Sequence, residues 1–140
     1  MTSSALVSPR PSVGLTVLRV VTGAVFAAHG AQKFFVYGIG GVTGAFAGMG
    51  VPLPEVIAPL VATIELVGGL ALVLGLGTRV AAALLAADML GAILLVHLKG
   101  GFFLPSGVEF ALALLGATVA LALAGPGAAA VDALRGRRRA

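Results

Sequence analysis

Apolar residues along the chain group into four long runs, separated by short polar or glycine-rich segments. The runs cover approximately residues 13–35, 54–75, 78–98 and 106–124. At roughly 1.5 Å per helical residue, each run can cross about 30 Å of hydrocarbon. Stretches such as LVGGLALVLGLG also lack the polar outer face that a soluble helical bundle needs. The pattern predicts an all-α polytopic membrane protein with a bundle of four transmembrane helices.

Two of the connecting segments carry structural signals of their own. Residues 36–53 are rich in glycine, and Val42, Phe46 and Met49 recur there at helical spacing. We therefore expect a short interfacial helix in this first outer loop. The connection GLGT between the second and third runs is so short that these helices must be antiparallel neighbours.

Composition agrees with a membrane protein. Hydrophobic residues make up 59% of the 140 residues and charged residues 10%, with a mean hydropathy of +1.13, and these values lie far outside soluble averages. The first run is of full spanning length, so we expect it to be retained and not cleaved as a signal peptide. The expected organisation is an N-terminal tail (1–12), one transmembrane domain (13–124) and a basic C-terminal tail (125–140).

The basic residues predict the orientation. Those assigned to one side of the membrane are Arg10, Arg79, Arg135, Arg137, Arg138 and Arg139, whereas only Lys33 and Lys99 lie near the other side. Positively charged segments stay in the cytoplasm, so both termini are predicted to be cytoplasmic in a multi-pass protein of the plasma membrane, that is, the cell inner membrane. Topology and anionic lipid also explain the tail GRRRA, so we expect no nucleic-acid partner.

Counting residues excludes several chemistries. The chain has no cysteine, which rules out a disulfide framework, a catalytic thiol and a cysteine-ligated iron–sulfur cluster. A haem held by two histidines would need His29 and His97 to face each other, yet their predicted depths differ by about a turn. His29 with Glu65 and Glu109 lacks the spacing of a dedicated metal site. We therefore expect no metal, no haem and no iron–sulfur cluster.

Polar residues interrupt the first apolar run in the stretch FAAHGAQKFF. One helical stripe contains Arg19, Gly23, Phe26, His29, Gly30 and Lys33. Charge facing lipid is costly, so this stripe should face the interior of the bundle. Gly30 is expected to clear space beside His29. Lys33 has two open interpretations, a ligand donor or a side chain that extends to the outer interface.

Acidic residues lie inside the other runs. Glu65 is near the midpoint of the second run, Asp88 is at the midpoint of the third, and Glu109 is in the outer turn of the fourth. Arg19 is expected to form a buried ion pair with Asp88 or Glu65, so that Arg19 and Asp88 are structural charges. The small residues Gly30, Gly68 and Gly69 are expected at close packing contacts.

Several motifs together resemble the DoxX family of small four-helix membrane proteins. The resemblance rests on LRVVTGAVFAAHGAQKFF, on GMGVPLPE, on ATIELVGGLALVLGLGTRVAA and on the closing GPG. By this resemblance the family's motif positions are Arg19, His29, Gly30, Lys33, Glu65, Gly69, Arg79 and Glu109. The family is named for a subunit of a thiosulfate:quinone oxidoreductase, and relatives are linked to membrane redox and oxidative-stress systems.

Three functional hypotheses remain open. In the first, a redox subunit binds a quinone-like ligand through His29, Lys33, Glu65 and Glu109, among the first, second and fourth helices. In the second, the protein is a non-catalytic membrane anchor or assembly partner for soluble redox or stress-response enzymes. In the third, it carries a small anionic metabolite. Enzymatic activity, ligand identity and homo-oligomer formation are not decided by the sequence.

Overall fold

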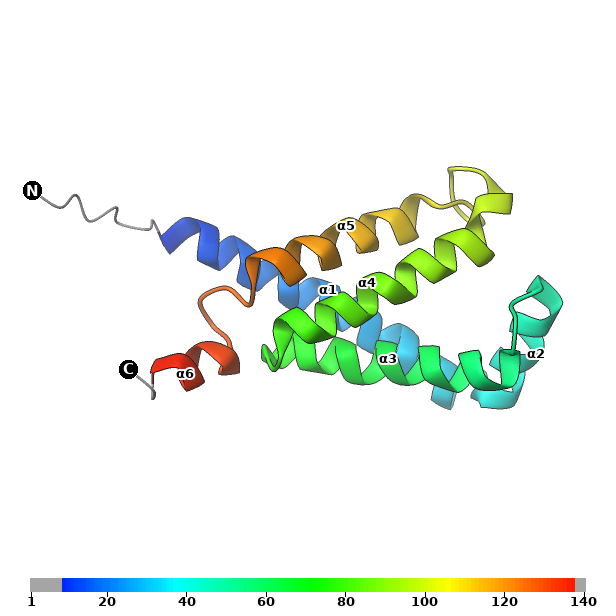
Figure 1. Cartoon of the computed structure of the whole chain (residues 1–140), viewed down its shortest axis with the longest axis horizontal. Helices are drawn as coiled ribbons and strands as arrows, with labels where there is room; N and C mark the ends of the chain where they lie inside the picture. The colour runs from blue at the N-terminus through cyan, green and yellow to red at the C-terminus, as the bar shows by residue number, and fades with distance from the viewer. Residues whose placement is uncertain (1–8, 138–140) are drawn as a thin grey trace, which may run out of the picture.

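The computed structural model describes residues 9–137, and every regular element in that range is helical. The elements are α1 (Pro9–Phe35), α2 (Gly38–Met49), α3 (Pro54–Leu74), α4 (Thr78–Leu95), the 3₁₀ turn η1 (His97–Gly100), α5 (Glu109–Ala124) and α6 (Val131–Arg137) (Figure 1). The expected all-α class is confirmed. Predictions that fall on residues 1–8, Arg138 or Arg139 lie outside the described range.

Three helices are long and apolar enough to cross a membrane, namely Ser12–Phe35, Pro54–Leu74 and Thr78–Leu95. The fourth apolar run differs from its prediction, because α5 is shorter and has 16 residues. Residues 101–108 instead fold into a closed loop, in which Val108 N donates to Gly101 O and Glu109 N donates to Phe102 O. These bonds occupy the backbone groups that would otherwise extend α5 toward its N-terminus.

A helix occurs in the first outer loop, where helical spacing predicted one. This helix, α2, packs against α1 and α3 and buries Val42. It ends at Gly50, whose φ of 79° lies in the left-handed region that glycine adopts readily. Its place at a membrane surface stays a prediction.

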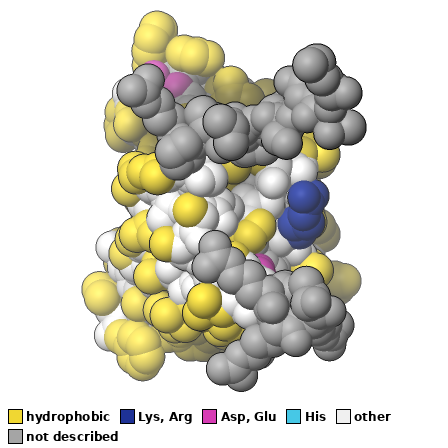
Figure 2. All heavy atoms as spheres, turned by 90° about the vertical axis from the view of Figure 1, so that its left-hand side faces the viewer, with side chains coloured by type: hydrophobic (Ala, Val, Ile, Leu, Met, Phe, Trp, Pro, Cys, Tyr) yellow, Lys and Arg dark blue, Asp and Glu magenta, His cyan; other side chains and the backbone are white. Residues whose placement is uncertain are grey.

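The long helices pack as two pairs, α1 with α3 and α4 with α5. A tight turn at residues 75–77 joins α3 to α4, and the two helices separate from this turn toward the end that carries α2 (Figure 1). At that end, side chains of both pairs enclose a cavity. Figure 2 looks onto the opposite end and shows apolar side chains on its flanks.

Glycines bring the backbones of α1 and α3 into contact. A Cβ built on Gly30 would lie 2.3 Å from Leu66 N, and one on Gly69 would lie 2.3 Å from Ala27 N. Gly68 is less crowded, since its nearest neighbour is the side chain of Leu85 at 3.2 Å. The expectation that Gly30 clears space beside His29 is wrong, because the backbone of α3 fills that space.

Candidate functional site

Arg19 is fully buried and pairs with neither Asp88 nor Glu65, so the expected ion pair is wrong. Its guanidinium donates to four backbone carbonyls, those of Leu72, Val73, Pro126 and Ala129. The last carbonyls of a helix have no partner within the helix, and the planar guanidinium has five donors to offer. Arg19 therefore fastens the end of α3 and the segment after α5 to α1.

Two more side chains complete a hydrogen-bond network at this end of the molecule. The Asp132 carboxylate accepts from Gly77 N at 2.8 Å and from Thr78 N at 2.9 Å, where α4 begins. Arg79 donates to Leu123 O at 2.7 Å, where α5 ends. Each contact satisfies backbone groups at a helix terminus, so this end of the molecule has a structural role.

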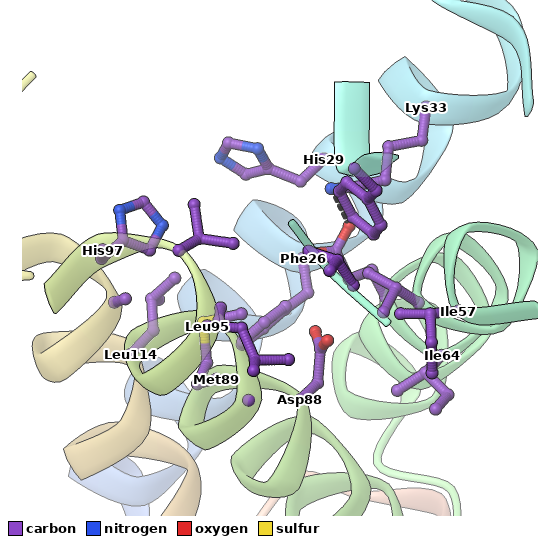
Figure 3. A pocket seen from close by; sticks show the side chains of 18 of the residues that line it. Phe26, His29, Lys33, Ile57, Ile64, Asp88, Met89, Leu95, His97 and Leu114 are labelled. Carbon is purple, nitrogen blue, oxygen red and sulfur yellow. Dashed lines mark hydrogen bonds and ion pairs between the residues drawn. The ribbon is translucent and has the colours of Figure 1, made fainter. Parts of the chain in front are cut away.

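A cavity of about 770 Å³ lies toward the other end, between the two helix pairs (Figure 3). Its walls come from α1, α2, α3, α4, the loop before α5 and the start of α5, and most of its lining side chains are apolar. Five of the lining residues are His, Lys, Asp or Glu, namely His29, Lys33, Glu65, Asp88 and His97. The volume lies in the range of about 300–1,000 Å³ typical of small-molecule sites.

An ion pair between Lys33 Nζ of α1 and Glu65 Oε2 of α3 forms one polar part of the cavity wall. The Glu65 side chain is 6% exposed and that of Lys33 is 17% exposed. Lys33 thus points into the bundle, and of its two interpretations the interfacial one does not fit. Burying the two charges costs desolvation energy, which can cancel their attraction. The ion pair is therefore weak evidence for a purely stabilising role.

Asp88 reaches into the cavity from the middle of α4, on the wall facing α3 (Figure 3). Its Oδ2 atom is buried and has no hydrogen-bond partner among residues 9–137. A buried carboxyl oxygen without a partner is costly and needs an explanation. The carboxyl group also lies within electrostatic range of Glu65 and Lys33. Asp88 is therefore a group of the cavity and not the partner of Arg19.

The sequence contained a signal for this position of Asp88. Seven residues of α4 line the cavity, and all of them except Met89 share one broad helix face: Leu84, Ala87, Asp88, Gly91, Ala92 and Leu95. Three of them, Ala87, Gly91 and Ala92, are small. A carboxylate that lies between small residues on one helix face indicates open space beside it. The depth of the carboxylate along the apolar run is a less direct indication.

The two histidines lie near the wide end of the cavity. The ring of His29 is tilted by 47° against that of Phe110, with centroids 6.0 Å apart, and makes no hydrogen bond within the described chain. His97 Nδ1 is 3.3 Å from Ser106 O. His29 thus has free ring nitrogens for a ligand, whereas one nitrogen of His97 faces the loop.

Glu109 lies apart from the other predicted ligand residues. Its Oε1 atom accepts from Leu104 N at 2.7 Å, which closes the loop of residues 101–108. The structure thus brings together His29, Lys33 and Glu65, leaves out Glu109, and adds Asp88 and His97. Over the described residues, no three His, Asp or Glu side chains are placed to hold a metal ion.

Apolar walls around a few polar groups suit a molecule with a flat apolar body and hydrogen-bonding atoms at its edge. Lys33 and the imidazole of His29 can donate to carbonyl oxygens, and Asp88 can exchange a hydrogen bond through its free oxygen. Water-soluble anions are less well matched, because Glu65 already neutralises Lys33 and no other Lys or Arg of the described residues lines the cavity.

Comparison with known proteins adds relatives to this geometry. A sequence model of the DoxX family matches residues 14–98. A Bacillus subtilis protein named "Putative oxidoreductase CatD" is 39% identical over 86% of this chain and 85% of its own length. An uncharacterized membrane protein of Mycobacterium tuberculosis is 42% identical over 66% of this chain and 56% of its own length. An uncharacterized protein of Haemophilus influenzae is 37% identical over 84% and 87%. No solved structure matches.

Proposed function

The chain belongs to the DoxX family, and we propose that it is an integral membrane subunit of a redox system that binds a quinone-like ligand in the cavity between α3 and α4. One observation carries the proposal. A cavity of about 770 Å³ with apolar walls holds the Lys33–Glu65 pair and a carboxyl oxygen of Asp88 that has no partner in the described chain.

A quinone ring is flat and apolar, and its two carbonyl oxygens accept hydrogen bonds. In this proposal Lys33 and His29 donate to one or both oxygens, because each reaches the cavity from α1. Asp88 lies on the opposite wall and exchanges a proton or hydrogen bond with the ligand. Glu65 keeps Lys33 in place through their ion pair. In this proposal the electrons come from a partner protein of the redox system.

The redox part of the proposal is also supported by the Bacillus subtilis relative, whose name includes the word oxidoreductase. That name describes the relative. It is relevant to this chain only because the two proteins share a family and similar sequences. It specifies no ligand. Quinone binding therefore rests on the cavity.

We further propose that α1, α3, α4 and α5 all cross the membrane, with α2 at the outer interface and both termini in the cytoplasm. The two ends of the described chain meet, because Ala128 N donates to Ser12 O at 3.1 Å. An even number of crossings returns a chain to the side where it began. The 16 residues of α5 span about 24 Å at roughly 1.5 Å per residue, so its crossing would be the shortest of the four.

The alternative function is a non-catalytic anchor for soluble redox or stress-response enzymes. One feature favours it, namely aromatic side chains that are largely exposed. Phe103 is 74% exposed and Phe35 is 80% exposed. Such residues also occur at membrane interfaces. We prefer the cavity because an anchor has no need of an unpaired carboxyl oxygen inside the bundle.

Quinone retention tests the proposal. The protein would be purified in mild detergent, equilibrated with a benzoquinone, washed and assayed for bound quinone. His29→Leu and Asp88→Asn should remain folded, because neither breaks a hydrogen bond of the described chain. Each should lower quinone affinity by about tenfold, the effect of one lost hydrogen bond.

Lys99→Met is the matched control, since Lys99 is exposed and lies outside the cavity. It should leave retention unchanged. Full quinone retention by well-folded His29→Leu and Asp88→Asn would contradict the proposed site. Absence of any quinone binding by the unmodified protein would favour the anchor.

A further inference from the structure

We propose that the cavity opens sideways between α3 and α4 into the hydrocarbon layer, and that this opening takes the apolar tail of a membrane-dissolved amphiphile. The identity of the polar headgroup rests on the proposed function, whereas the tail slot rests on the geometry of α3 and α4. The ligand class is thus a ring with a long alkyl or isoprenoid chain, and not a water-soluble quinone.

The rim of the cavity is uncovered and apolar. Leu60 of α3 is 49% exposed and Leu84 of α4 is 50% exposed, yet both line the cavity. Ala87 of α4 is also exposed and lines it. A rim that met water would be expected to carry polar side chains. Both helices are apolar enough to span a membrane, so the rim faces lipid.

Small residues on α4 keep this opening wide. Gly91 lines the cavity, and a Cβ built on it would meet no atom within 4 Å. The separation of α3 and α4 from their shared turn adds to this width (Figure 1). The slot therefore continues from the polar groups, past Ala87 and Gly91, to the surface of the helices.

The volume also exceeds what the polar groups need. A single ring held between Lys33 and Asp88 would fill only part of about 770 Å³. The remaining walls are apolar, from residues such as Ile57, Ile64 and Leu114 (Figure 3). Water gains few hydrogen bonds in such a space, so an apolar occupant is favoured. A tail attached to the headgroup supplies that occupant without a second molecule.

The test compares two benzoquinones with the same ring, one with a decyl chain and one with a methyl group. Gly91→Leu should fill the slot without a clash, because space beside Gly91 is open and leucine favours helix. Gly116→Leu is the matched control, since Gly116 of α5 is also open but does not line the cavity. Melting temperatures would verify that both variants fold, and Ala87→Leu would serve as a second blocking variant.

We expect Gly91→Leu and Ala87→Leu to weaken binding of the decyl quinone by tenfold or more, roughly 1.4 kcal/mol. Binding of the methyl quinone should be unchanged, and Gly116→Leu should match the unmodified protein for both. If the decyl and methyl forms bind equally well to every variant, the tail slot is excluded while the quinone site stands.

A different failure separates the slot from the headgroup. In this outcome the unmodified protein binds neither quinone but retains a phospholipid, detected by mass spectrometry, that Gly91→Leu loses and Gly116→Leu keeps. That result would support the slot and overturn the quinone function. If no tailed molecule is retained by any variant, or if a second copy of the chain is found to cover the rim, the slot is overturned.

Discussion

Arg19 is a buried cation whose donors all go to backbone carbonyls. Two of those carbonyls, of Leu72 and Val73, lie in the last turn of α3, where the helix dipole is negative. The acid whose charge acts on Arg19 is Asp132, in the first turn of α6. A guanidinium suits this place better than an ammonium group, because its fork of donors reaches several carbonyls at once.

Replacing Arg19 with alanine should destabilise the protein strongly, since several buried carbonyls would lose their donor. Each orphaned group costs about 1–3 kcal/mol, so the melting temperature in detergent should fall by many degrees. The melting temperature of Arg19→Lys should lie between those of the unmodified protein and Arg19→Ala, because lysine offers three donors. Lys99→Ala is the control, as Lys99 is exposed and lies in η1. Equal and small effects of Arg19→Ala and Lys99→Ala would show that Arg19 does not hold these segments.

At the scale of elements, the pairing of α1 with α3 depends on glycine. Gly23 and Gly69 each have backbone atoms of the other helix within 3 Å of the place where a Cβ would be. Small residues allow such approach, and dispersion contacts between the backbones then stabilise the pair in lipid. The same pairing places Lys33 of α1 beside Glu65 of α3. The glycine contacts therefore help to set the geometry of the cavity.

A single methyl group should disturb this pairing. Gly30→Ala places a Cβ 2.3 Å from Leu66 N, so the helices must move apart, at a cost of about 1–3 kcal/mol. Gly14→Ala lies in the same helix with nothing within 4 Å, and it should be neutral or slightly stabilising. Thermal unfolding of both variants in detergent measures the difference. A Gly30→Ala protein as stable as Gly14→Ala would mean that α1 and α3 are not in backbone contact.

Periodicity and length predicted the helices well, because a run of apolar residues in lipid has few alternatives to a helix. The start of α5 was misplaced, since the closed loop at residues 101–108 depends on backbone bonds that hydropathy does not register. The prediction that Arg19 pairs with an acid used the charge of each residue and its depth along the apolar run. The sequence composition does not show which backbone carbonyls at helix ends lack a hydrogen-bond donor.

Cavity residues were partly predictable for a related reason. His29, Lys33 and Glu65 share inward faces that helical spacing identifies. Glu109 was included because its depth matched, but its carboxylate turns back to Leu104 N in its own loop. The position of Asp88 depends on how far α4 separates from α3, which is a tertiary property that one sequence does not contain.

At the scale of the whole molecule, the two ends differ in kind. One end holds the turn between α3 and α4, the start of α1 and α6, joined by hydrogen bonds of Arg19, Arg79 and Asp132. The other end holds α2, the loop of residues 101–108 and the cavity. One end is fastened by hydrogen bonds and the other end contains the cavity. This difference suits the proposed entry of a ligand from one half of the bilayer.

This arrangement leads to a prediction of topology. The basic residues predict that the hydrogen-bonded end lies in the cytoplasm and that α2 and the 101–108 loop lie outside. Because the natural chain has no cysteine, single cysteines can report each side with a membrane-impermeant thiol reagent. Gly44→Cys in α2 and Ser106→Cys in the loop should be labelled on intact cells, or on spheroplasts if an outer membrane is present. Ala128→Cys should be labelled only after lysis.

Gly44 has open space for a side chain, and Ser106 and Ala128 are exposed, so none of the three substitutions should alter the fold. Labelling of Gly44→Cys and Ser106→Cys on opposite sides would mean that only one of α3 and α4 crosses the membrane. Labelling of Ala128→Cys on intact cells, with the other two protected, would reverse the orientation and place the cavity toward the cytoplasm.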